Sequence, residues 1–245
     1  MSYQQFAYIY DQLMTDAPYE QWLNFTRNYV KTPATILDVA TGTGAIALML
    51  AKEGYLVSAV DVSEDMLDVA KEKVEDAGVD VAFFQRDMRN MDGLGQYDAV
   101  TMFCDSLNYV LEETDVKQAF TRVYNHLCEG GTFLFDVHSR EKIAQQINDR
   151  LYASNEEDIS FVWVCEPGEY ANMVEHDLSF FIQDDEEGGY RRVDEWHEQR
   201  TFSPEDYETW LREVGFEQVE ISADFTEARP NGENERILFV AKKGY

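Results

Sequence analysis

The 245-residue sequence has few basic residues, and this excludes one large class of partner. Lys and Arg together number 20 against 48 Asp and Glu, for a formal net charge of -28 at pH 7. Nucleic-acid backbones are anionic and are bound by basic surfaces, so this balance argues against DNA or RNA. The acidity fits a cationic or neutral small-molecule partner, and it fits equally a surface that is acidic only for solubility in a salty cytoplasm.

Cysteine and long apolar runs are also scarce. Cys104, Cys128 and Cys165 are far apart and form no C-x-x-C pair, which argues against a disulfide frame or a thiolate metal site and favours a reducing compartment. No stretch approaches the roughly 20 apolar residues of a membrane span, and the first residues lack the basic-then-apolar layout of a signal peptide. We therefore expect a cytoplasmic protein that makes no membrane contact.

Short apolar runs alternate with helical patterns over most of the chain. These runs are unbroken, which is typical of parallel strands covered on both faces. The expected strands are 35–39, 55–61, 81–85, 97–103 and 131–137, with two more at 216–222 and 236–243. Ser63 and Gly78 are placed to begin and end one of the helices between them. The pattern predicts a doubly wound, mostly parallel α/β sheet.

One stretch departs from this pattern. Runs at 159–165, 172–183 and 190–202 are separated by turn residues, which predicts a three-stranded antiparallel meander. We therefore expect four parts along the chain. They are a helical cap over 1–30, the first part of the α/β core over 31–149, an antiparallel insertion covering the active site over 150–202, and the rest of the core over 203–245.

The glycine loop in ILDVATGTGAIA, residues 36–47, is the first candidate site. No Lys-Ser or Lys-Thr pair follows Gly44, so the loop is not a P-loop for nucleoside triphosphates. GTGAIA does match the dinucleotide pattern G-x-G-x-x-G/A, and Asp61 at the end of the second strand is placed to bind a ribose. This motif alone leaves a nicotinamide-dependent oxidoreductase open.

Carboxylates at three strand ends narrow the choice of cofactor. Asp38, four residues before the first glycine, suits an ammonium group better than a pyrophosphate, and Asp61 suits a ribose. Asp87, after the third strand, can accept a hydrogen bond from an adenine amino group. A ligand with adenine, ribose and a cationic amino-acid tail but no phosphate is S-adenosylmethionine.

At these motifs the sequence resembles the class I S-adenosylmethionine-dependent methyltransferases. LDVATGTG looks like the family's first motif, AVDVSEDML like the second and QRDM like the adenine loop, and YDAVTMF looks like the strand before the active-site loop. YIYDQLM, CDSLNYV and the meander are similar to bacterial small-molecule methyltransferases, including amino-sugar N-methyltransferases. The resemblance implies a seven-stranded sheet of order 3-2-1-4-5-7-6 whose last strand is antiparallel.

The strand ends and the resemblance together give the candidate cofactor contacts. These are Trp22, Asp38, Ala40, Thr41, Gly42, Gly44, Asp61, Val62, Met66, Asp87, Met88 and Cys104. Ala40 stands where the family's usual motif has its first glycine, and its methyl group is expected to narrow the loop slightly. Met66 or Met88 would flank the adenine, or else belong to the core. Tyr10, with Tyr3 and Trp22, would fold over the cofactor or dock an amphipathic helix.

Methyl transfer requires the nucleophile, the methyl group and the sulfur to be held in line and shielded from water. An amine needs little more than an acceptor for its proton, whereas a hydroxyl needs a base. His138 and Tyr10 are the candidate catalytic residues, because imidazole titrates near neutral pH and a phenol can point at a polarised methyl group. The candidate substrate contacts are Asn108, Tyr109, Glu195, His197 and Arg200.

Two acidic side chains, Asp105 and Asp136, are candidate metal ligands. They lie at adjacent strand ends but lack an evident third ligand, so no catalytic metal is expected.

We expect a methyltransferase acting on a small molecule, with nitrogen favoured over oxygen as the acceptor atom. The alternatives are a nicotinamide-dependent oxidoreductase and a non-catalytic methyltransferase-like module that binds a basic protein. The oligomeric state stays open.

Overall fold

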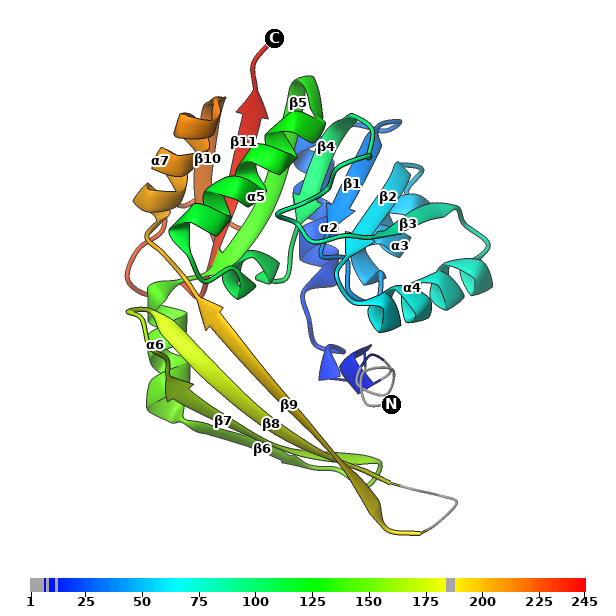
Figure 1. Cartoon of the computed structure of the whole chain (residues 1–245), viewed down its shortest axis with the longest axis vertical. Helices are drawn as coiled ribbons and strands as arrows, with labels where there is room; N and C mark the ends of the chain where they lie inside the picture. The colour runs from blue at the N-terminus through cyan, green and yellow to red at the C-terminus, as the bar shows by residue number, and fades with distance from the viewer. Residues whose placement is uncertain (1–6, 8, 12, 184–187) are drawn as a thin grey trace.

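The computed structural model describes residues 7, 9–11, 13–183 and 188–245. Its main sheet has seven strands in the order β10-β11-β5-β4-β1-β2-β3 (Figure 1). They are β1 Thr35–Val39, β2 Leu56–Asp61, β3 Val81–Gln85, β4 Tyr97–Met102, β5 Leu127–His138, β10 Phe216–Ala223 and β11 Arg236–Lys243. Strand β11 is antiparallel to β5 and to β10, and the other neighbours are parallel. The expected strand order and antiparallel last strand are both confirmed.

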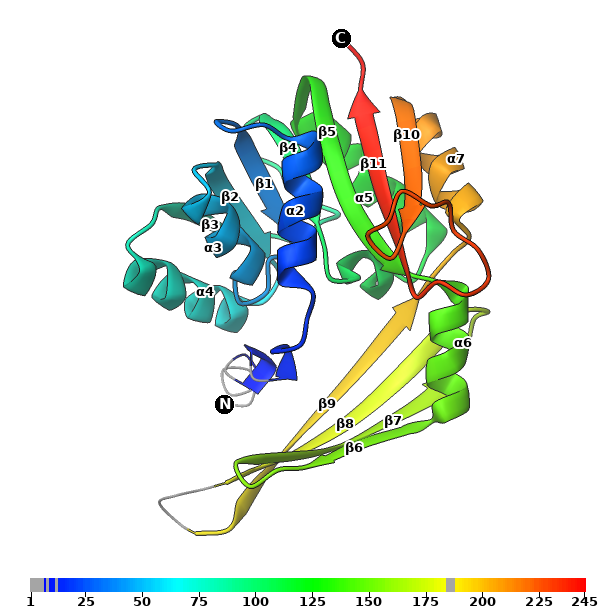
Figure 2. The same cartoon turned by 180° about the vertical axis from the view of Figure 1, so that it is seen from behind.

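Helices cover both faces of this sheet. They are α2 Tyr19–Tyr29, α3 Ala45–Lys52, α4 Glu64–Ala77, α5 Glu113–His126 and α7 Pro204–Val214, with the short 3-10 helix η1 at Ser106–Tyr109. Helix α6, Arg140–Asp149, packs instead on the second sheet described below. Helices α5 and α7 pack on one face, and α2 and α3 pack on the other (Figures 1 and 2). No helix among the described residues is both long and apolar enough to cross a membrane.

The predicted helix ends of α4 are present and have the expected cause. The Ser63 side chain accepts a hydrogen bond from the backbone N–H of Met66, which satisfies one of the donors that the first turn leaves free. At the other end Gly78 adopts a left-handed conformation, with φ of +65°, that a glycine takes without steric cost. Helix α4 therefore starts directly after the tip of β2, beside the predicted ribose contact.

A second sheet extends from the core. It is antiparallel, in the order β6-β7-β8-β9, and comprises β6 Leu151–Asn155, β7 Ile159–Pro167, β8 Met173–Gln183 and β9 Tyr190–Arg200. The sequence predicted three of these strands and missed β6, which is short and half polar and lies at the edge of the sheet. Figures 1 and 2 show this sheet running from the end of the core at which the strands β4 and β5 finish, toward the described part of the N-terminal segment.

Candidate functional site

A pocket lies at the carboxyl ends of β1 and β4, the edge at which open α/β sheets bind ligands. It is lined by Tyr10, Tyr19, Asp38, Ala40, Thr41, Gly42, Thr43, Ala45, Ile46, Phe103, Cys104 and Ser106. Its volume is about 40 Å³, which is room for only a few water molecules. Six residues predicted from the sequence meet here, namely Tyr10, Asp38, Ala40, Thr41, Gly42 and Cys104. None of these described lining residues is basic, so the pocket offers no cation to a phosphate.

The glycine loop owes its shape to three left-handed residues. Ala40, Gly42 and Gly44 have φ of +55°, +56° and +74°. The methyl group of Ala40 disfavours this left-handed conformation, so the backbone at Ala40 is strained. This effect differs from the slight narrowing of the loop that was expected from the sequence. A Cβ on Gly42 would meet nothing within 4 Å. A Cβ on Gly44 would lie 2.8 Å from the Cβ of Ala70, so Gly44 allows α3 and α4 to approach, and it does not line the pocket.

Asp38 is buried at the end of β1, and each oxygen of its carboxylate accepts a hydrogen bond from one hydroxyl group. Thr41 donates to Oδ2 at 2.6 Å and Thr101 donates to Oδ1 at 2.7 Å. Burial raises the pKa of Asp38 to about 6, although the two hydroxyl groups oppose the shift. The ionised form is therefore costly, and a cation bound in the pocket would stabilise it.

Asp61 ties the glycine loop to the start of α4. Its Oδ2 accepts the backbone N–H of Gly42 at 2.8 Å, and its Oδ1 accepts that of Ser63 at 2.9 Å. Burial raises the pKa of Asp61, and these backbone donors oppose the rise. Each carboxylate oxygen has a second lone pair, so a ribose can still be bound. The neighbouring Val62 is 66% exposed, an apolar side chain presented at the strand tip.

The predicted adenine contacts lie in different surroundings. Asp87 forms an ion pair with Arg89, with Oδ2 at 2.6 Å from Nη2, and this contact lowers the pKa of Asp87. Arg89 also reaches Asp115 at 2.8 Å. Met88 packs against the main core, whereas Met66 packs with residues of the N-terminal segment. The ion pair with Arg89, two residues along the chain, competes with the adenine contact that was predicted for Asp87.

The N-terminal segment, described at residues 7, 9–11 and 13–18, closes over the pocket. The Tyr10 hydroxyl lies 3.8 Å from the Cys104 sulfur. Asp11 accepts hydrogen bonds from the Thr43 hydroxyl at 2.5 Å and from the Lys73 ammonium at 2.8 Å. These contacts hold the segment against both the glycine loop and α4. Tyr3, the other predicted lid residue, lies outside the described residues.

Trp22, predicted as a cofactor contact, is fully buried away from the pocket. Its Nε1 donates to Oδ1 of Asp136 at 2.9 Å, and the guanidinium of Arg236 lies 5.0 Å from the indole centroid. Its ring stacks near Phe103, which does line the pocket. The structure therefore places Trp22 behind the pocket wall.

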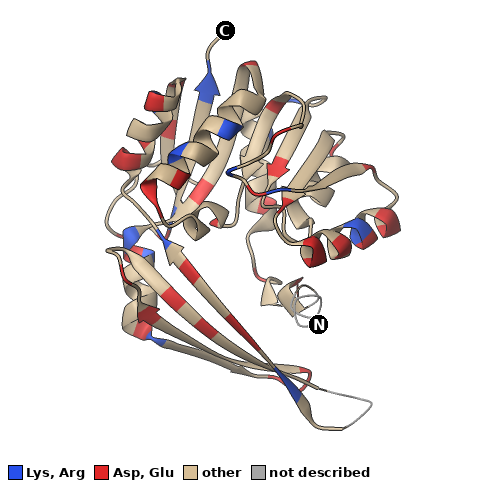
Figure 3. Cartoon of the chain, in the orientation of Figure 1, with Lys and Arg blue, Asp and Glu red and all other residues tan. Residues whose placement is uncertain are grey.

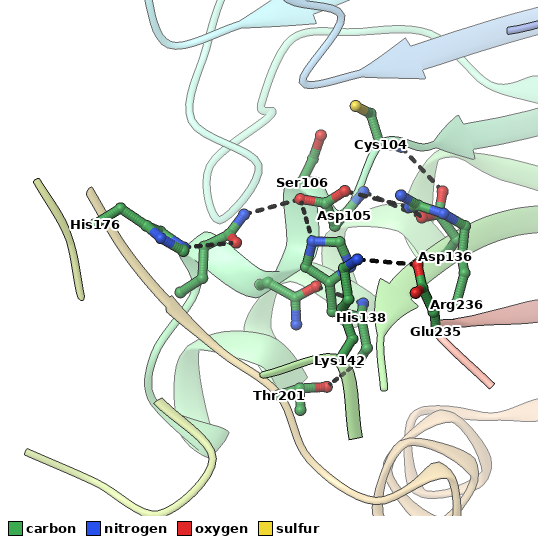
Figure 4. A network of polar contacts seen from close by, with 12 residues as sticks. Cys104, Asp105, Ser106, Asp136, His138, Lys142, His176, Thr201, Glu235 and Arg236 are labelled. Atoms are coloured by element: carbon green, nitrogen blue, oxygen red, sulfur yellow. Dashed lines mark hydrogen bonds and ion pairs between the residues drawn. The ribbon is translucent and has the colours of Figure 1, made fainter. Parts of the chain in front are cut away.

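A buried network of charges joins the tips of β4, β5 and β11 (Figure 4). Arg236 contacts Asp136 and lies 3.2 Å from Oδ1 of Asp105. The backbone N–H groups of Cys104 and Asp105 both donate to Asp136, at 2.9 and 3.1 Å. Burial raises the pKa of Asp136, and Arg236 opposes that rise. Asp136 thus fixes the loop that carries Cys104 into the pocket.

His138 and Asp105 form a pair within this network. Nε2 of His138 lies 3.3 Å from Oδ2 of Asp105. Burial alone would raise the pKa of Asp105, but His138 and Arg236 outweigh it, and the net shift is downward. Burial lowers the pKa of His138, with Asp105 opposing. Nδ1 of His138 is buried and has no hydrogen-bond partner among the described residues.

A chain of side chains connects this pair to the second sheet. Trp163 donates to Nδ1 of His176 at 3.0 Å, and Nε2 of His176 lies 3.3 Å from Oε1 of Gln199. Because the indole can only donate, Nδ1 must accept and Nε2 must carry the proton. Nε2 of Gln199 then donates to Oδ2 of Asp105 at 2.9 Å. Burial lowers the pKa of His176 to about 4, so this imidazole is neutral near pH 7.

The five predicted substrate contacts divide into two groups. Asn108 is buried, donates to the carbonyl of Arg200 and accepts from the N–H of His138, so it joins backbone segments. Arg200 donates to the Leu111 carbonyl, and its guanidinium lies over the ring of Phe202. Both side chains are thus committed to packing between the core and the second sheet.

The other three remain accessible on one face. Tyr109 is 51% exposed, and its ring lies edge-on to that of His197 at a centroid distance of 5.9 Å. Glu195 and His197 alternate with buried Val193 and Gln199 along β9, so all four side chains share one face of the strand. Glu195 and His197 are half-buried between them.

Three residues of the site, Arg236, Gln199 and Asp11, were not predicted from the sequence. The position of Arg236 could have been predicted, because an antiparallel strand begins at the edge where its parallel neighbours end. Arg236 pairs in register with His138. Gln199 and Asp11 carry no such signal, since their partners are 94 and 32 residues away and on other elements. No group of three or more His, Cys, Asp or Glu side chains in the described part of the chain is placed to hold a metal ion.

Comparison with known proteins gives consistent results. A methyltransferase-domain family model matches residues 36–131. A Geobacillus sp. (strain WCH70) protein, named as a putative methyltransferase, is 47% identical over 248 residues, covering 99% of this chain and all of the relative. A glycine/sarcosine N-methyltransferase of Halorhodospira halochloris is 26% identical over 90% of this chain and 80% of its own.

Two solved structures share the complete architecture. An S-adenosylmethionine-dependent methyltransferase from Clostridium acetobutylicum ATCC 824 superposes with a TM-score of 0.87 at 30% identity, covering 99% of both chains. A sugar N-methyltransferase from Streptoalloteichus sp ATCC 53650 gives a TM-score of 0.72 at 19% identity, covering 97% of this chain and 93% of its own, a likeness of fold. The resemblance inferred from the sequence motifs is confirmed.

Proposed function

Because this chain belongs to the S-adenosylmethionine-dependent methyltransferases, we propose that it methylates the nitrogen of a small-molecule amine. The cofactor is S-adenosylmethionine. When bound, it supplies a sulfonium methyl group, whose bond to sulfur breaks, leaving the electron pair on sulfur, as a bond to the acceptor nitrogen forms. Membership of the family establishes that a methyl group is transferred. The identity of the acceptor is what we propose.

The chemistry of the pocket lining suits a phosphate-free, cationic cofactor. Asp38 would bind the amino group of the methionine part, and Thr41 and Gly42 would lie along the same part. Asp61 would bind the ribose, and Val62 would pack on the adenine side. The support for this arrangement is the chemistry of the lining, which has a buried carboxylate with a raised pKa and no basic residue among the described residues that line it.

Asp105 is the observation that carries the choice of nitrogen. It directly follows Cys104 at the pocket, and its pKa is lowered, so it is ionised at neutral pH. During N-methylation, positive charge moves from the sulfonium to the acceptor nitrogen, and a preorganised carboxylate beside that nitrogen stabilises the change. The nearby Cys104 thiol and Tyr10 phenol stay protonated near pH 7, since burial raises both pKa values, so neither is available as a base.

His138 and Tyr10 then have separate roles. Tyr10 covers the pocket from the N-terminal segment and excludes water from the methyl group. His138 acts through Asp105, because its Nε2 contacts that carboxylate and its Nδ1 is buried. It is therefore a positioning residue, which keeps Asp105 ionised and oriented toward the acceptor. The Halorhodospira relative is named as a glycine/sarcosine N-methyltransferase, which supports nitrogen as the acceptor atom.

A transfer experiment tests the proposal. Purified protein is incubated with S-adenosylmethionine labelled in its methyl group and with an extract of cells expressing the chain, which is then separated at a 1 kDa cut-off. We expect label in the small-molecule fraction as an N-methyl group, identified by its carbon chemical shift. Label on protein or nucleic acid would contradict a small-molecule acceptor, and an O-methyl product would contradict the choice of nitrogen.

A further inference from the structure

We propose that the acceptor is an elongated molecule that carries a cationic group and no phosphate, and that Glu195 of the second sheet holds the cationic group. This inference rests on the proposed function and defines the chemical class of its substrate. The recognising surface, called here the acceptor face, consists of Leu178, Glu195 and His197 on β8 and β9, together with Tyr109 of η1.

The acceptor face is bounded at both ends by contacts with the rest of the protein. Toward the tip of the sheet, Val193 is buried in a cluster with Ile9 of the N-terminal segment and Phe180 of β8. Toward the core, Gln199 is buried and donates to Asp105. Only the stretch of β9 between these contacts is left half-buried on this face. An acceptor lying along it would reach Asp105 and the pocket at one end.

Glu195 has an unusual environment for a carboxylate. No hydrogen bond or ion pair to it is present among the described residues, and its cross-strand neighbour is Leu178. On the opposite face of the same strand, Asp194 accepts from Ser179 at 2.7 Å and pairs with Arg192. Partial burial without a partner raises the pKa of Glu195. A ligand cation would provide the missing partner.

The basic residues nearby are not placed to bind a phosphate at the acceptor face. Arg200 lies on the other face, donates to the Leu111 carbonyl and packs on Tyr170 and Phe202. Arg236 is committed to Asp105 and Asp136. Arg191 shares the face of Glu195, but it is exposed and lies beyond Val193, on the far side of the N-terminal contact. In Figure 3 acidic residues recur along β8 and β9.

Spacing along β9 indicates the length of the acceptor. Glu195 lies four residues before Gln199, which is about 13 Å along a strand at roughly 3.3 Å per residue. Gln199 contacts Asp105, beside which the reacting nitrogen is proposed to lie. The cationic group and the reacting nitrogen are thus at opposite ends of the acceptor. Leu178 lies opposite Glu195 itself, and Tyr109 with His197 gives the intervening part an aromatic wall.

The first test is the charge of the labelled product. The small-molecule fraction from the transfer experiment is passed at pH 6 over a cation exchanger and, separately, over an anion exchanger. We expect the labelled product to be retained by the cation exchanger alone. A product retained by the anion exchanger, or by neither, would overturn this inference while leaving the proposed methyl transfer intact. Complete absence of label below 1 kDa would remove the proposed function itself, and the inference with it.

The second test assigns the cation to Glu195. With the cationic fraction as acceptor, Glu195→Gln should raise KM by about tenfold, as expected for the loss of one charge-assisted contact, and leave kcat within about twofold. Glu198→Gln, three residues along on the opposite face, is the matched control and should leave both constants unchanged. S-adenosylmethionine affinity, measured by calorimetry, should be equal in all three proteins. Equal KM values for the two variants would overturn the role of Glu195.

Discussion

Gly44 and Ala70 lie so close that a Cβ on the glycine would stand 2.8 Å from the Cβ of the alanine. This contact joins the start of α3 to the middle of α4, the two helices that flank the predicted cofactor. By contrast, a Cβ on Gly42 would point into open space. The two glycines of this motif therefore have different physical roles. Gly44 lets α3 and α4 pack closely, and Gly42 leaves the space beside the loop open.

Replacing each glycine with alanine separates these reasons. Gly44→Ala adds both left-handed strain and overpacking, so we expect a loss of about 3 kcal/mol in the free energy of unfolding. Gly42→Ala adds only the strain, about 1 kcal/mol, but places a methyl group where the cofactor approaches. Urea unfolding and calorimetry with S-adenosylmethionine measure the two effects. Equal destabilisation by both substitutions would contradict the packing role of Gly44.

Asp38 predicts a pH dependence of cofactor binding. Its pKa in the folded protein is about 6, above the ordinary value of 3.8, so the folded state binds this proton more tightly than the unfolded state does. The stabilising contribution of protonated Asp38 is full below pH 3.8 and is lost as the pH rises toward 6. Cofactor binding has the opposite sign, because an ammonium group favours the ionised carboxylate.

We therefore expect S-adenosylmethionine affinity to fall as the pH is lowered from 7 to 5, by up to about tenfold. Asp38→Asn should weaken binding at pH 7 and remove most of this dependence, while stabilising the cofactor-free protein at that pH. Calorimetric titrations at several pH values, with thermal unfolding of the free protein, provide the measurements. An unchanged pH profile in the asparagine variant would show that another group titrates.

The positions of three residues at the strand tips could be predicted from the sequence. Asp38, Asp61 and Cys104 could be placed because each follows an apolar run, and the ends of parallel strands meet at one edge. The surroundings of Asn108 and Trp22 could not be predicted in the same way. The fold uses both side chains to satisfy buried backbone or carboxylate groups from distant segments. Such pairings depend on tertiary contacts, which local patterns do not encode.

The second sheet shows the same division. Alternating runs and turn residues located β7, β8 and β9, but β6 has too few apolar residues to signal a strand and forms because β7 offers it a free edge. Along β9, the sequence marks Glu195 and Arg200 alike as candidate substrate contacts. Only the structure separates Arg200, which packs on other elements, from Glu195, which has no partner among the described residues.

His138 should affect catalysis through Asp105. His138→Ala removes the Nε2 contact, which raises the pKa of Asp105 because one of the groups that lowers it is lost. We expect kcat to fall by about tenfold, the acid limb of the pH–rate profile to shift upward, and S-adenosylmethionine affinity to stay within about twofold. His126→Ala, at the far end of α5, is the control. A lower rate without a shifted profile would indicate a purely structural role.

The ion pair between Lys73 and Asp11 is expected to slow the dissociation of the cofactor. The pocket is covered by Tyr10, and the adjacent Asp11 is held by Thr43 and by Lys73, whose ammonium lies 2.8 Å from Oδ2. S-adenosylmethionine is much larger than this pocket of about 40 Å³, so it would have to displace the segment to enter or leave. Lys73→Met removes a half-buried ion pair worth about 1 kcal/mol, so the dissociation rate measured by stopped flow should rise about fivefold. Lys71→Met, on the same helix and paired with exposed Asp68, should leave that rate unchanged. Equal rates in both variants would mean that the segment does not control release.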